Sequence, residues 1–334
     1  MTSPNKELKR GKWQPYQGDE VSWGKMLKNF PDKGYLNDTS WGKHLSNMGW
    51  VCLRWEFSKS ENPIAYCQSF FKSYPFGIGV LWIPDGIVGN YLYISSLNQD
   101  LQHSLGIRYC YIRFRDSMIF NANDYIKLLK VGWVRPATFL SYGMTMSLNL
   151  SQSIESIQAG LSKNWRKTLK KSLNMPFDIV TVSDPVAIAE LYLEMKSSKS
   201  LSASEIYSQD AITSMMKCYQ ENIIVLGAED KEGNLVAIRG ALVDKNKATD
   251  IFAATSLSGR ALMASHAIFM ALLLKCQNQG CKLYDLNGIN PSSNMGVYNF
   301  KKGTGASPLV SLGEFEWSNN RLVSFGINFK SKYW

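Results

Sequence analysis

The stretch that decides the fold of this chain lies near its carboxyl end. It reads Tyr284-Asp285-Leu286-Asn287-Gly288-Ile289-Asn290-Pro291 and, after four further residues, Gly296-Val297-Tyr298-Asn299-Phe300-Lys301-Lys302-Gly303-Thr304-Gly305. The first part predicts a short strand that ends in a turn at Gly288 and Pro291. The second part predicts a loop whose glycines keep one aromatic and two lysine side chains close to the backbone. Such a loop is a candidate acyl-transfer site, although an FKKG tetrapeptide alone is more often a solvated edge.

The segments before this stretch alternate between strand and helix patterns. The predicted elements, in chain order, are a strand at 177–182, helices at 185–196 and 208–221, strands at 223–228, 235–243 and 249–255, a helix at 261–279 and a strand at 282–286. Strands, helix and strand in this order are the core of a GNAT acyltransferase domain.

The first half of the chain also predicts a mixed α/β domain. Residues 77–83 form an apolar run that ends at Pro84-Asp85-Gly86, and residues 109–115 alternate as a half-buried strand does. A short helix follows at 125–131, and a strand at 144–150.

One long helix is predicted after Ser151, which offers an N-cap side chain. Its apolar stripe is formed by Ile154, Ile157, Leu161, Trp165, Leu169 and Leu173. Its other side carries Lys163, Arg166, Lys167, Lys170 and Lys171. A solvated lysine face is common, but like charges three and four residues apart repel. An anionic ligand would offset that repulsion.

The order of four motifs resembles the Fem family, the non-ribosomal peptidyltransferases that attach amino acids to peptidoglycan precursors. The closing DLNGI and GVYNFKKGTGA strings are similar to the last motif of that family. The other three matches are Asn37-Asp38-Thr39-Ser40-Trp41-Gly42-Lys43 with Gly49-Trp50, Ile83-Pro84-Asp85-Gly86-Ile87-Val88, and Leu161-Ser162-Lys163-Asn164-Trp165-Arg166-Lys167. Asp85 departs from the family, which usually has a basic residue there. The resemblance covers about residues 35 to 317.

The resemblance implies an α/β (α+β) fold of two tandem GNAT-like domains. We expect the first domain at 1–147, the second at 148–317, and the segment 318–334 packed back on the first. The long coiled-coil insertion of some family members has no room between Lys171 and Ile223, which already holds two helices and a strand.

The resemblance also implies roles for individual residues. It places the functional lysine at Lys301, with Phe300 packing beside it, and places at Arg166 an arginine that contacts precursor phosphates. The planar guanidinium suits that work, because it binds phosphate oxygens in pairs. Asp285, at a strand end, is a candidate proton acceptor or a structural aspartate. The remaining candidates for substrate binding are Lys163, Lys43, Tyr298 and Lys302, with Lys43 the weaker because the lysine spacing after Trp41 departs from the family.

Composition limits the remaining choices. The net charge of +10 and the pI near 9.2 favour an anionic partner. The six cysteines are scattered and form no CxxC pair, which predicts buried, reduced thiols. With only three histidines in the sequence, a His-based triad or a histidine metal site is improbable. His266 lies in an apolar helix pattern and is predicted to be a satisfied core histidine. No signal peptide or bilayer-spanning run is visible, so we expect a cytoplasmic protein, either free or peripheral to the inner membrane face.

Two enzymatic functions fit this pattern. The first is transfer of an aminoacyl group from aminoacyl-tRNA to an amine of a phosphorylated peptidoglycan or envelope precursor, without a cofactor. The second is an acyl-CoA N-acyltransferase that acts on an amino sugar or a related precursor. Met263 stands where GNAT enzymes need the first glycine of their pyrophosphate loop, which weakens CoA as the donor. A non-enzymatic nucleic-acid binder lacks any recognised signature, and no DNA partner is expected.

Overall fold

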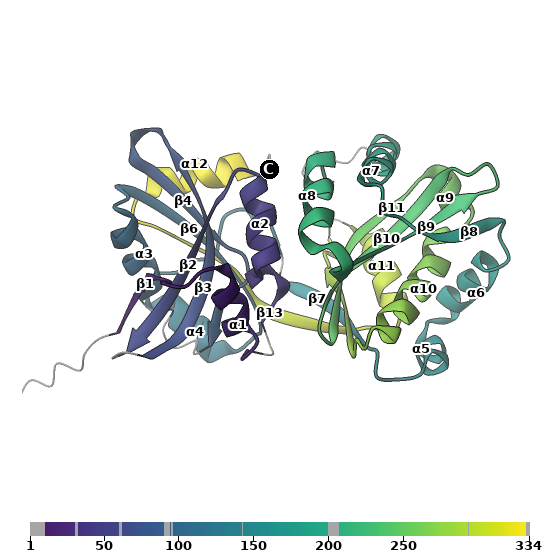
Figure 1. Ribbon diagram of the computed structural model, residues 1–334, viewed down its shortest axis with the longest axis horizontal. Helices are drawn as coiled ribbons and strands as arrows, with labels where there is room; N and C mark the ends of the chain where they lie inside the picture. The colour runs from purple at the N-terminus through teal and green to yellow at the C-terminus, as the bar shows by residue number, and fades with distance from the viewer. Residues whose placement is uncertain are drawn as a thin grey trace, which may run out of the picture. The chain divides into compact units, whose positions relative to one another are not determined.

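The computed structural model describes residues 11–30, 33–59, 62–89, 94, 96–141, 143–199, 207–292 and 294–331. The chain forms two compact units (Figure 1). The first combines residues 1–143 with 311–333, and the second is formed by residues 144–310. The chain therefore crosses between the units twice. Each unit is a sheet covered by helices, which is the predicted mixed α/β arrangement.

The sheet of the second unit has the strand order β13-β7-β12-β11-β10-β9-β8. Its strands are β7 (Met144–Asn149), β8 (Phe177–Thr181), β9 (Ile223–Asp230), β10 (Leu235–Asp244), β11 (Lys247–Thr255), β12 (Leu283–Gly288) and the first part of β13 (Ser307–Ser318). Neighbouring strands are antiparallel except β11 and β12, which run parallel.

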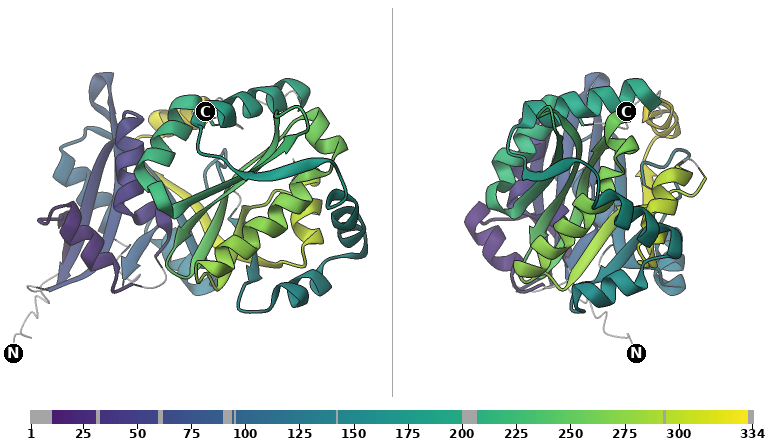
Figure 2. Two further views of the ribbon diagram at one scale, coloured as in Figure 1. Left: turned by 45° about the vertical axis from the view of Figure 1, so that its right-hand side comes forward. Right: turned by 90° about the vertical axis from the view of Figure 1, so that its right-hand side faces the viewer.

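Helices cover both faces of this sheet. They are α5 (Ile154–Gly160), α6 (Lys163–Ser172), α7 (Pro185–Lys199), α8 (Gln209–Tyr219), α9 (Leu257–Ala261), α10 (Ala264–Asn278) and α11 (Met295–Gly303), with a 3-10 turn η5 at Gln220–Asn222. Figure 2 shows α7 and α8 on one side of the sheet and α10 with α6 on the other. The core lies between the sheet and α5, α6 and α10.

The parallel strands β11 and β12 separate soon after they meet. Their register pairs only residues 247–249 with residues 283–285, although β11 continues to Thr255 and β12 to Gly288. Backbone groups beyond this point need other partners. The divergence opens the sheet at its middle, and the candidate site lies there.

The long helix predicted after Ser151 is wrong, because the structure has two helices. Ser153 caps α5, the chain extends at Leu161 (φ −63°, ψ 144°), and Ser162 caps α6. The Ser162 N–H donates to the carbonyl of Gly303 at 2.9 Å. This contact with α11 explains the break, because a continuous helix would use the same N–H internally.

Two further predictions near the site are corrected. The helix predicted at 261–279 is divided into α9 and α10 at Met263, whose backbone is left-handed (φ 55°, ψ 23°). The predicted glycine-rich loop at 296–305 is the helix α11, which the Asn294 side chain caps by accepting from the Val297 N–H at 3.2 Å. Lys301 is therefore presented by a helix.

The first unit is a sheet with the order β1-β2-β3-β4-β6-β13. Its strands are β1 (Lys12–Pro15), β2 (Val51–Lys59), β3 (Asn62–Tyr74), β4 (Ile78–Ile83), β6 (Tyr109–Ile119) and the second part of β13, with β5 (Ile87–Gly89) beside β3. Its helices are α1 (Glu20–Leu27), α2 (Thr39–Asn47), α3 (Leu97–Leu105), α4 (Ala122–Lys130) and α12 (Arg321–Ser331), with 3-10 turns η1 (Tyr35–Asn37) and η2 (Pro75–Gly77).

Strand β6 departs from the predicted alternation. Residues 110–114 are all buried. Helices and loops cover both faces of this sheet, so the charged Arg113 is buried as well.

Two of the Fem-like motifs meet in the first unit. Asn37 Nδ2 donates to the carbonyl of Asp85 at 3.1 Å, and the Trp23 indole donates to the carbonyl of Asn37 at 2.9 Å. Asp85, which replaces the usual basic residue, accepts a hydrogen bond from the Ser117 hydroxyl. The Asp85 side chain and backbone thus both form hydrogen bonds that stabilise this turn.

No helix within the described residues is long and apolar enough to cross a bilayer.

Candidate active site

Lys301 is buried at the open end of β12. Its side chain is on α11 and the residue is only 7 % exposed. The ammonium donates to the carbonyl of Gly288 at 2.8 Å and to that of Asn287 at 3.3 Å. The two partners belong to the turn predicted from the sequence, so strand, turn and helix together fix the lysine.

Burial changes the acidity of this lysine. It lowers the pKa of the Lys301 ammonium to about 8, while the nearby Asp250 carboxylate opposes the shift and Arg239 adds to it. Two carbonyl contacts do not neutralise a charge, so the ammonium is costly to bury. A positive charge held at such a cost is typical of a functional site.

The end of β12 contains a residue with a left-handed backbone. Asn287 adopts a left-handed backbone (φ 64°), and its side-chain amide donates to the carbonyl of Asp250 at 3.1 Å. Asp285 Oδ1 accepts from the Asn287 N–H at 2.9 Å and from the Thr145 hydroxyl, and Oδ2 pairs with Lys247 at 3.2 Å. Both oxygens of the Asp285 carboxylate therefore have partners, and these contacts hold this part of the backbone in place.

A buried ion pair lies beneath the site. The guanidinium of Arg239 on β10 pairs with the carboxylate of Asp250 on β11, and both residues are buried. Tyr284 donates its hydroxyl to Asp250 Oδ1 at 3.2 Å. Burial raises the pKa of Asp250, while Arg239 opposes the rise. A register shift of β10 against β11 between Gly240 and Ala241 lies next to the pair, as bulges often do near active sites.

Phe300 packs inside an aromatic cluster. Its ring centroid lies 5.5 Å from that of Trp165, 5.1 Å from that of His266 and 5.7 Å from that of Phe269. The guanidinium carbon of Arg239 lies 4.7 Å from the centre of the Phe300 ring. The phenylalanine predicted beside the lysine thus packs against side chains of α6, α10 and β10.

Buried polar nitrogens around Phe300 lack hydrogen-bond partners within the described residues. They are Trp165 Nε1, Arg239 Nε and His266 Nδ1. Burial lowers the pKa of His266 to about 4, so its imidazole is neutral at pH 7. An interaction with the backbone of Met263 opposes this shift, so the satisfied core histidine stays a prediction. Unsatisfied buried donors and acceptors are rare and mark places where water or a ligand binds.

Helix α6 brings the predicted phosphate-binding residues close to α11. Trp165 packs on Gly303, where an added Cβ would lie 2.6 Å from Trp165 Cδ1. Arg166 and Lys163 are exposed on the other side of α6, and Arg166 Nη1 donates to the carbonyl of Ala159 at 2.8 Å. None of the five cations of α6 forms an ion pair with a described acidic side chain. The basic face is thus available to an anion.

The other candidates do not surround Lys301. Lys302 is exposed on α11 and lies 5.8 Å from the ring of the half-buried Tyr298. Lys43 belongs to the first unit, on α2, and pairs with Glu20 at 3.1 Å. The structure therefore brings together Lys301, Phe300 and Asp285, and leaves Tyr298 and Lys302 on the outer part of the same helix.

Sequence reasoning missed Arg239, Asp250 and Tyr284. A signal was present for the first two, because each is the one charged residue inside an apolar strand segment, VAIRGALV and ATDIFAAT. An isolated charge in a strand buried on both faces requires a partner. The pairing itself depends on the register of β10 and β11.

The prediction of buried thiols is confirmed for Cys67, Cys110, Cys276 and Cys281, whereas Cys52 and Cys218 are half-buried. No group of three His, Cys, Asp or Glu side chains in the described part of the chain is arranged to hold a metal ion.

This arrangement suits stabilisation of an oxyanion. A fixed, buried cation interacts strongly with negative charge that develops beside it during a reaction. Acyl transfer to an amine develops such charge on the carbonyl oxygen, and the neutral amine needs alignment more than activation.

One family model matches part of the chain. Residues 208–330 match the model of the FemAB family, a range that contains β9 to β12, Lys301 and most of α12. No curated protein matches the chain in sequence.

Solved structures extend the likeness to the whole chain. The crystal structure of FemX is similar with a TM-score of 0.74 at 13 % identity, covering 94 % of this chain and 100 % of that one. A tandem GNAT protein from the clavulanic acid biosynthesis pathway has a TM-score of 0.59 at 10 % identity, with 93 % and 99 % covered. L-PGS from Bacillus licheniformis has a TM-score of 0.54 at 13 % identity, with 94 % and 96 % covered.

These likenesses confirm the predicted fold class, a mixed α/β fold like that of Fem and tandem GNAT structures. Within the described residues, α7 and α8 are the helices between Lys171 and Ile223, and neither is a long coiled coil. The FemAB family match over residues 208–330, together with this shared fold, supports an acyltransferase.

Proposed function

We propose that the protein transfers an aminoacyl group from aminoacyl-tRNA to an amine of a phosphorylated peptidoglycan or cell-envelope precursor. The observation that carries the proposal is the buried ammonium of Lys301, held by the Gly288 and Asn287 carbonyls where β11 and β12 diverge. These substrates would place the reaction in the cytoplasm.

The reaction requires little from the protein besides alignment and charge. The acceptor amine attacks the ester carbonyl of the donor, a C–N bond forms, and the C–O bond to the tRNA ribose breaks. The proton lost by the amine leaves with the ribose hydroxyl. In this scheme Lys301 stabilises the oxyanion of the tetrahedral intermediate, Phe300 shields that charge from water, and Asp285 holds the turn that presents the lysine's partners.

The acceptor's phosphates are assigned to α6. Its exposed cations Lys163 and Arg166 lie on a helix that packs against α11, so a bound phosphate group would be held near the acyl-transfer residues. Lys302 and Tyr298 on α11 are assigned to the same substrate. Lys43, paired with Glu20 in the first unit, is a weaker candidate.

An acyl-CoA donor remains the second candidate, because of the turn before α10. Met263 adopts the left-handed conformation that favours glycine, so the backbone there keeps the form of a glycine-containing loop. The methionine side chain would stand where a pyrophosphate needs close backbone approach. The backbone conformation of Met263 therefore favours CoA binding, and its side chain opposes CoA binding.

Salt dependence separates the two donors. Many phosphates of a tRNA would contact a chain of net charge +10, so binding of charged tRNA should weaken steeply as salt is raised. CoA carries few phosphates and should give a shallow slope. Ribonuclease added to a coupled extract should abolish transfer. Transfer that survives ribonuclease and proceeds with acyl-CoA alone would replace the first function by the second.

A further inference from the structure

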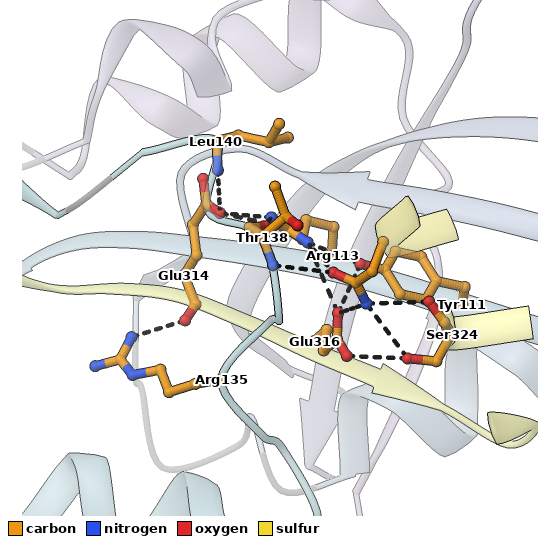
Figure 3. Close-up of polar contacts among 9 residues, drawn as sticks. Tyr111, Arg113, Arg135, Thr138, Leu140, Glu314, Glu316 and Ser324 are labelled. Carbon is orange, nitrogen blue, oxygen red and sulfur yellow. Dashed lines mark hydrogen bonds and ion pairs between the residues drawn. The ribbon is translucent and has the colours of Figure 1, made fainter. Parts of the chain in front are cut away.

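Backbone carbonyls, and no carboxylate of the described residues, lie within bonding distance of the Lys301 ammonium. The two carbonyls belong to consecutive residues at the end of β12. The first unit treats a buried cation differently, because the guanidinium of Arg113 is held by the carboxylates of Glu314 and Glu316 (Figure 3). The position of the Lys301 ammonium therefore depends on where the backbone places two carbonyl oxygens.

These carbonyls lie in a part of β12 that the neighbouring strands do not hold. The pairing of β11 with β12 ends at Asp285, and the pairing of β7 with β12 shifts its register between Asp285 and Gly288. Neither register includes Asn287. Its left-handed backbone (φ 64°) also differs from that of a strand, so contacts of side chains must hold this residue in place.

Hydrogen bonds of side chains attach Asn287 to its surroundings. On the side of β7, the Thr145 hydroxyl donates to the Asn287 carbonyl at 2.9 Å. Within β12, Asp285 Oδ1 accepts from the Asn287 N–H at 2.9 Å. On the side of β11, Asn287 Nδ2 donates to the carbonyl of Asp250 at 3.1 Å. This last contact, the interstrand bond, joins β12 to β11 beyond the point where their pairing ends.

We propose that Asn287 is a positioning residue for Lys301, because its interstrand bond fixes the two carbonyl oxygens that hold the ammonium. The position requires a left-handed backbone together with a side-chain donor. Asparagine provides both, since it tolerates this backbone better than most residues do. Glycine would tolerate the backbone but could not form the interstrand bond. The effect on catalysis rests on the proposed function, whereas the effect on the ionisation of Lys301 does not.

Asn287→Gly tests the interstrand bond without adding strain. Glycine adopts the left-handed backbone readily, so the variant should remain folded. The charged groups around the ammonium are Asp250 on β11, Arg239 on β10 and Asp285 on β12, and the variant retains all three. We expect the pKa of Lys301 to fall below its wild-type value of about 8, because a buried ammonium loses stabilisation when its acceptors are displaced. Titration of isotope-labelled lysine by NMR measures this pKa, and Lys301→Met assigns the resonance.

Two further variants separate the interstrand bond from backbone strain. Lys245→Gly is the matched control, because Lys245 is left-handed (φ 51°) and exposed in the turn between β10 and β11. It should leave the pKa of Lys301 unchanged. Asn287→Ala loses the same amide and strains the backbone, so it should shift this pKa as Asn287→Gly does and melt at a lower temperature. A wild-type pKa in Asn287→Gly would overturn the proposal. So would a rise toward 10.5, which would mean that the bond excludes water and does not place the carbonyls.

Transfer kinetics test the role of Asn287 in the reaction. Asn287→Gly should lower kcat by about 10- to 100-fold and leave KM for the acceptor nearly unchanged, because a misplaced charge acts mainly on the transition state. A wild-type kcat in this variant would overturn the proposal even if the pKa of Lys301 shifts. Absence of transfer from charged tRNA by the wild type would contradict the proposed function, and the NMR titration would still decide whether Asn287 positions Lys301.

Discussion

At the scale of single residues, the main feature of the candidate site is the buried ammonium of Lys301, whose burial lowers the stability of the folded protein. Lys301 has two carbonyl partners and is almost completely buried. Its pKa of about 8 means that the folded protein holds the charged form less readily than the unfolded chain does. A shift of this size from the ordinary 10.5 corresponds to roughly 3 kcal/mol at neutral pH. Stability therefore does not explain why a lysine occupies this position.

Lys301→Met should reduce the rate of transfer by about 10²–10³, because one electrostatic contact to the oxyanion is lost. In the wild type the rate should also fall as pH rises through about 8, where the ammonium loses its proton. The measurement is single-turnover transfer across that range. A Lys301→Met enzyme with wild-type turnover would remove this lysine from the mechanism.

The control for that variant is its stability as a function of pH. Between pH 8 and 10.5 the unfolded chain binds more protons at Lys301 than the folded protein does, so the wild type should gain stability with rising pH relative to Lys301→Met. Denaturant unfolding at both ends of this range measures the difference. Parallel curves for the two proteins would mean that burial does not perturb the lysine.

Arg166 tests the acceptor side. Arg166→Ala should raise KM for a phosphorylated acceptor with little change in kcat, because a remote phosphate contact is equal in the ground and transition states. Lys171→Ala is a suitable control, since Lys171 lies on another part of the same exposed helix surface. The lost bond to the Ala159 carbonyl is exposed and should cost little stability. A collapsed kcat beside an unchanged KM would contradict the assignment.

At the scale of elements, local sequence patterns predicted the order of strands and helices in the second unit, but not the breaks within helices. The break at Leu161 depends on the Ser162 N–H reaching Gly303, which lies far along the chain. The break at Met263 places a non-glycine residue in a left-handed conformation, which propensity argues against. The sequence did not predict the helix α11, because its glycines favour the prediction of a loop. Such features are fixed by tertiary contacts that no local window contains.

The same limit explains what the sequence revealed of the site. Similarity to a family indicated Lys301 and Phe300, but the partners of the lysine come from a turn that packs beneath it. Arg239 and Asp250 were visible as isolated charges, yet their meeting needs the register of two strands. The role of each candidate in catalysis stays a prediction.

Met263 gives a prediction at this scale. Met263→Gly should leave the melting temperature unchanged or raise it, with a gain of up to about 1 kcal/mol, because glycine adopts the left-handed turn without strain. Met263→Val should be destabilised by more than about 1 kcal/mol, since a β-branched residue fits this conformation poorly. Thermal melts of the two variants provide the measurement. Equal destabilisation would show that packing of the methionine side chain dominates at the turn.

At the scale of the whole molecule, the two units are joined through one shared strand. Residues 307–310 of β13 pair with β7 in the second unit, and residues 311–318 pair with β6 in the first. The first unit is therefore completed only by residues that follow the second unit in the chain. The second unit holds its own core and its strands within one continuous segment.

This asymmetry predicts the outcome of a truncation. A chain that ends at Val310 should lose the fold of the first unit, because it loses the β6 partner and leaves Arg113 buried without Glu314, Glu316 and Asn328. The second unit should stay folded. Trp165 is the one tryptophan between residues 144 and 310, so substituting it separates the fluorescence of the two units. We expect red-shifted emission from the first unit and a cooperative melt, followed by far-ultraviolet circular dichroism, from the second. Retention of blue-shifted emission by tryptophans 13, 23, 55 and 133 would show that the first unit folds without β13 and α12.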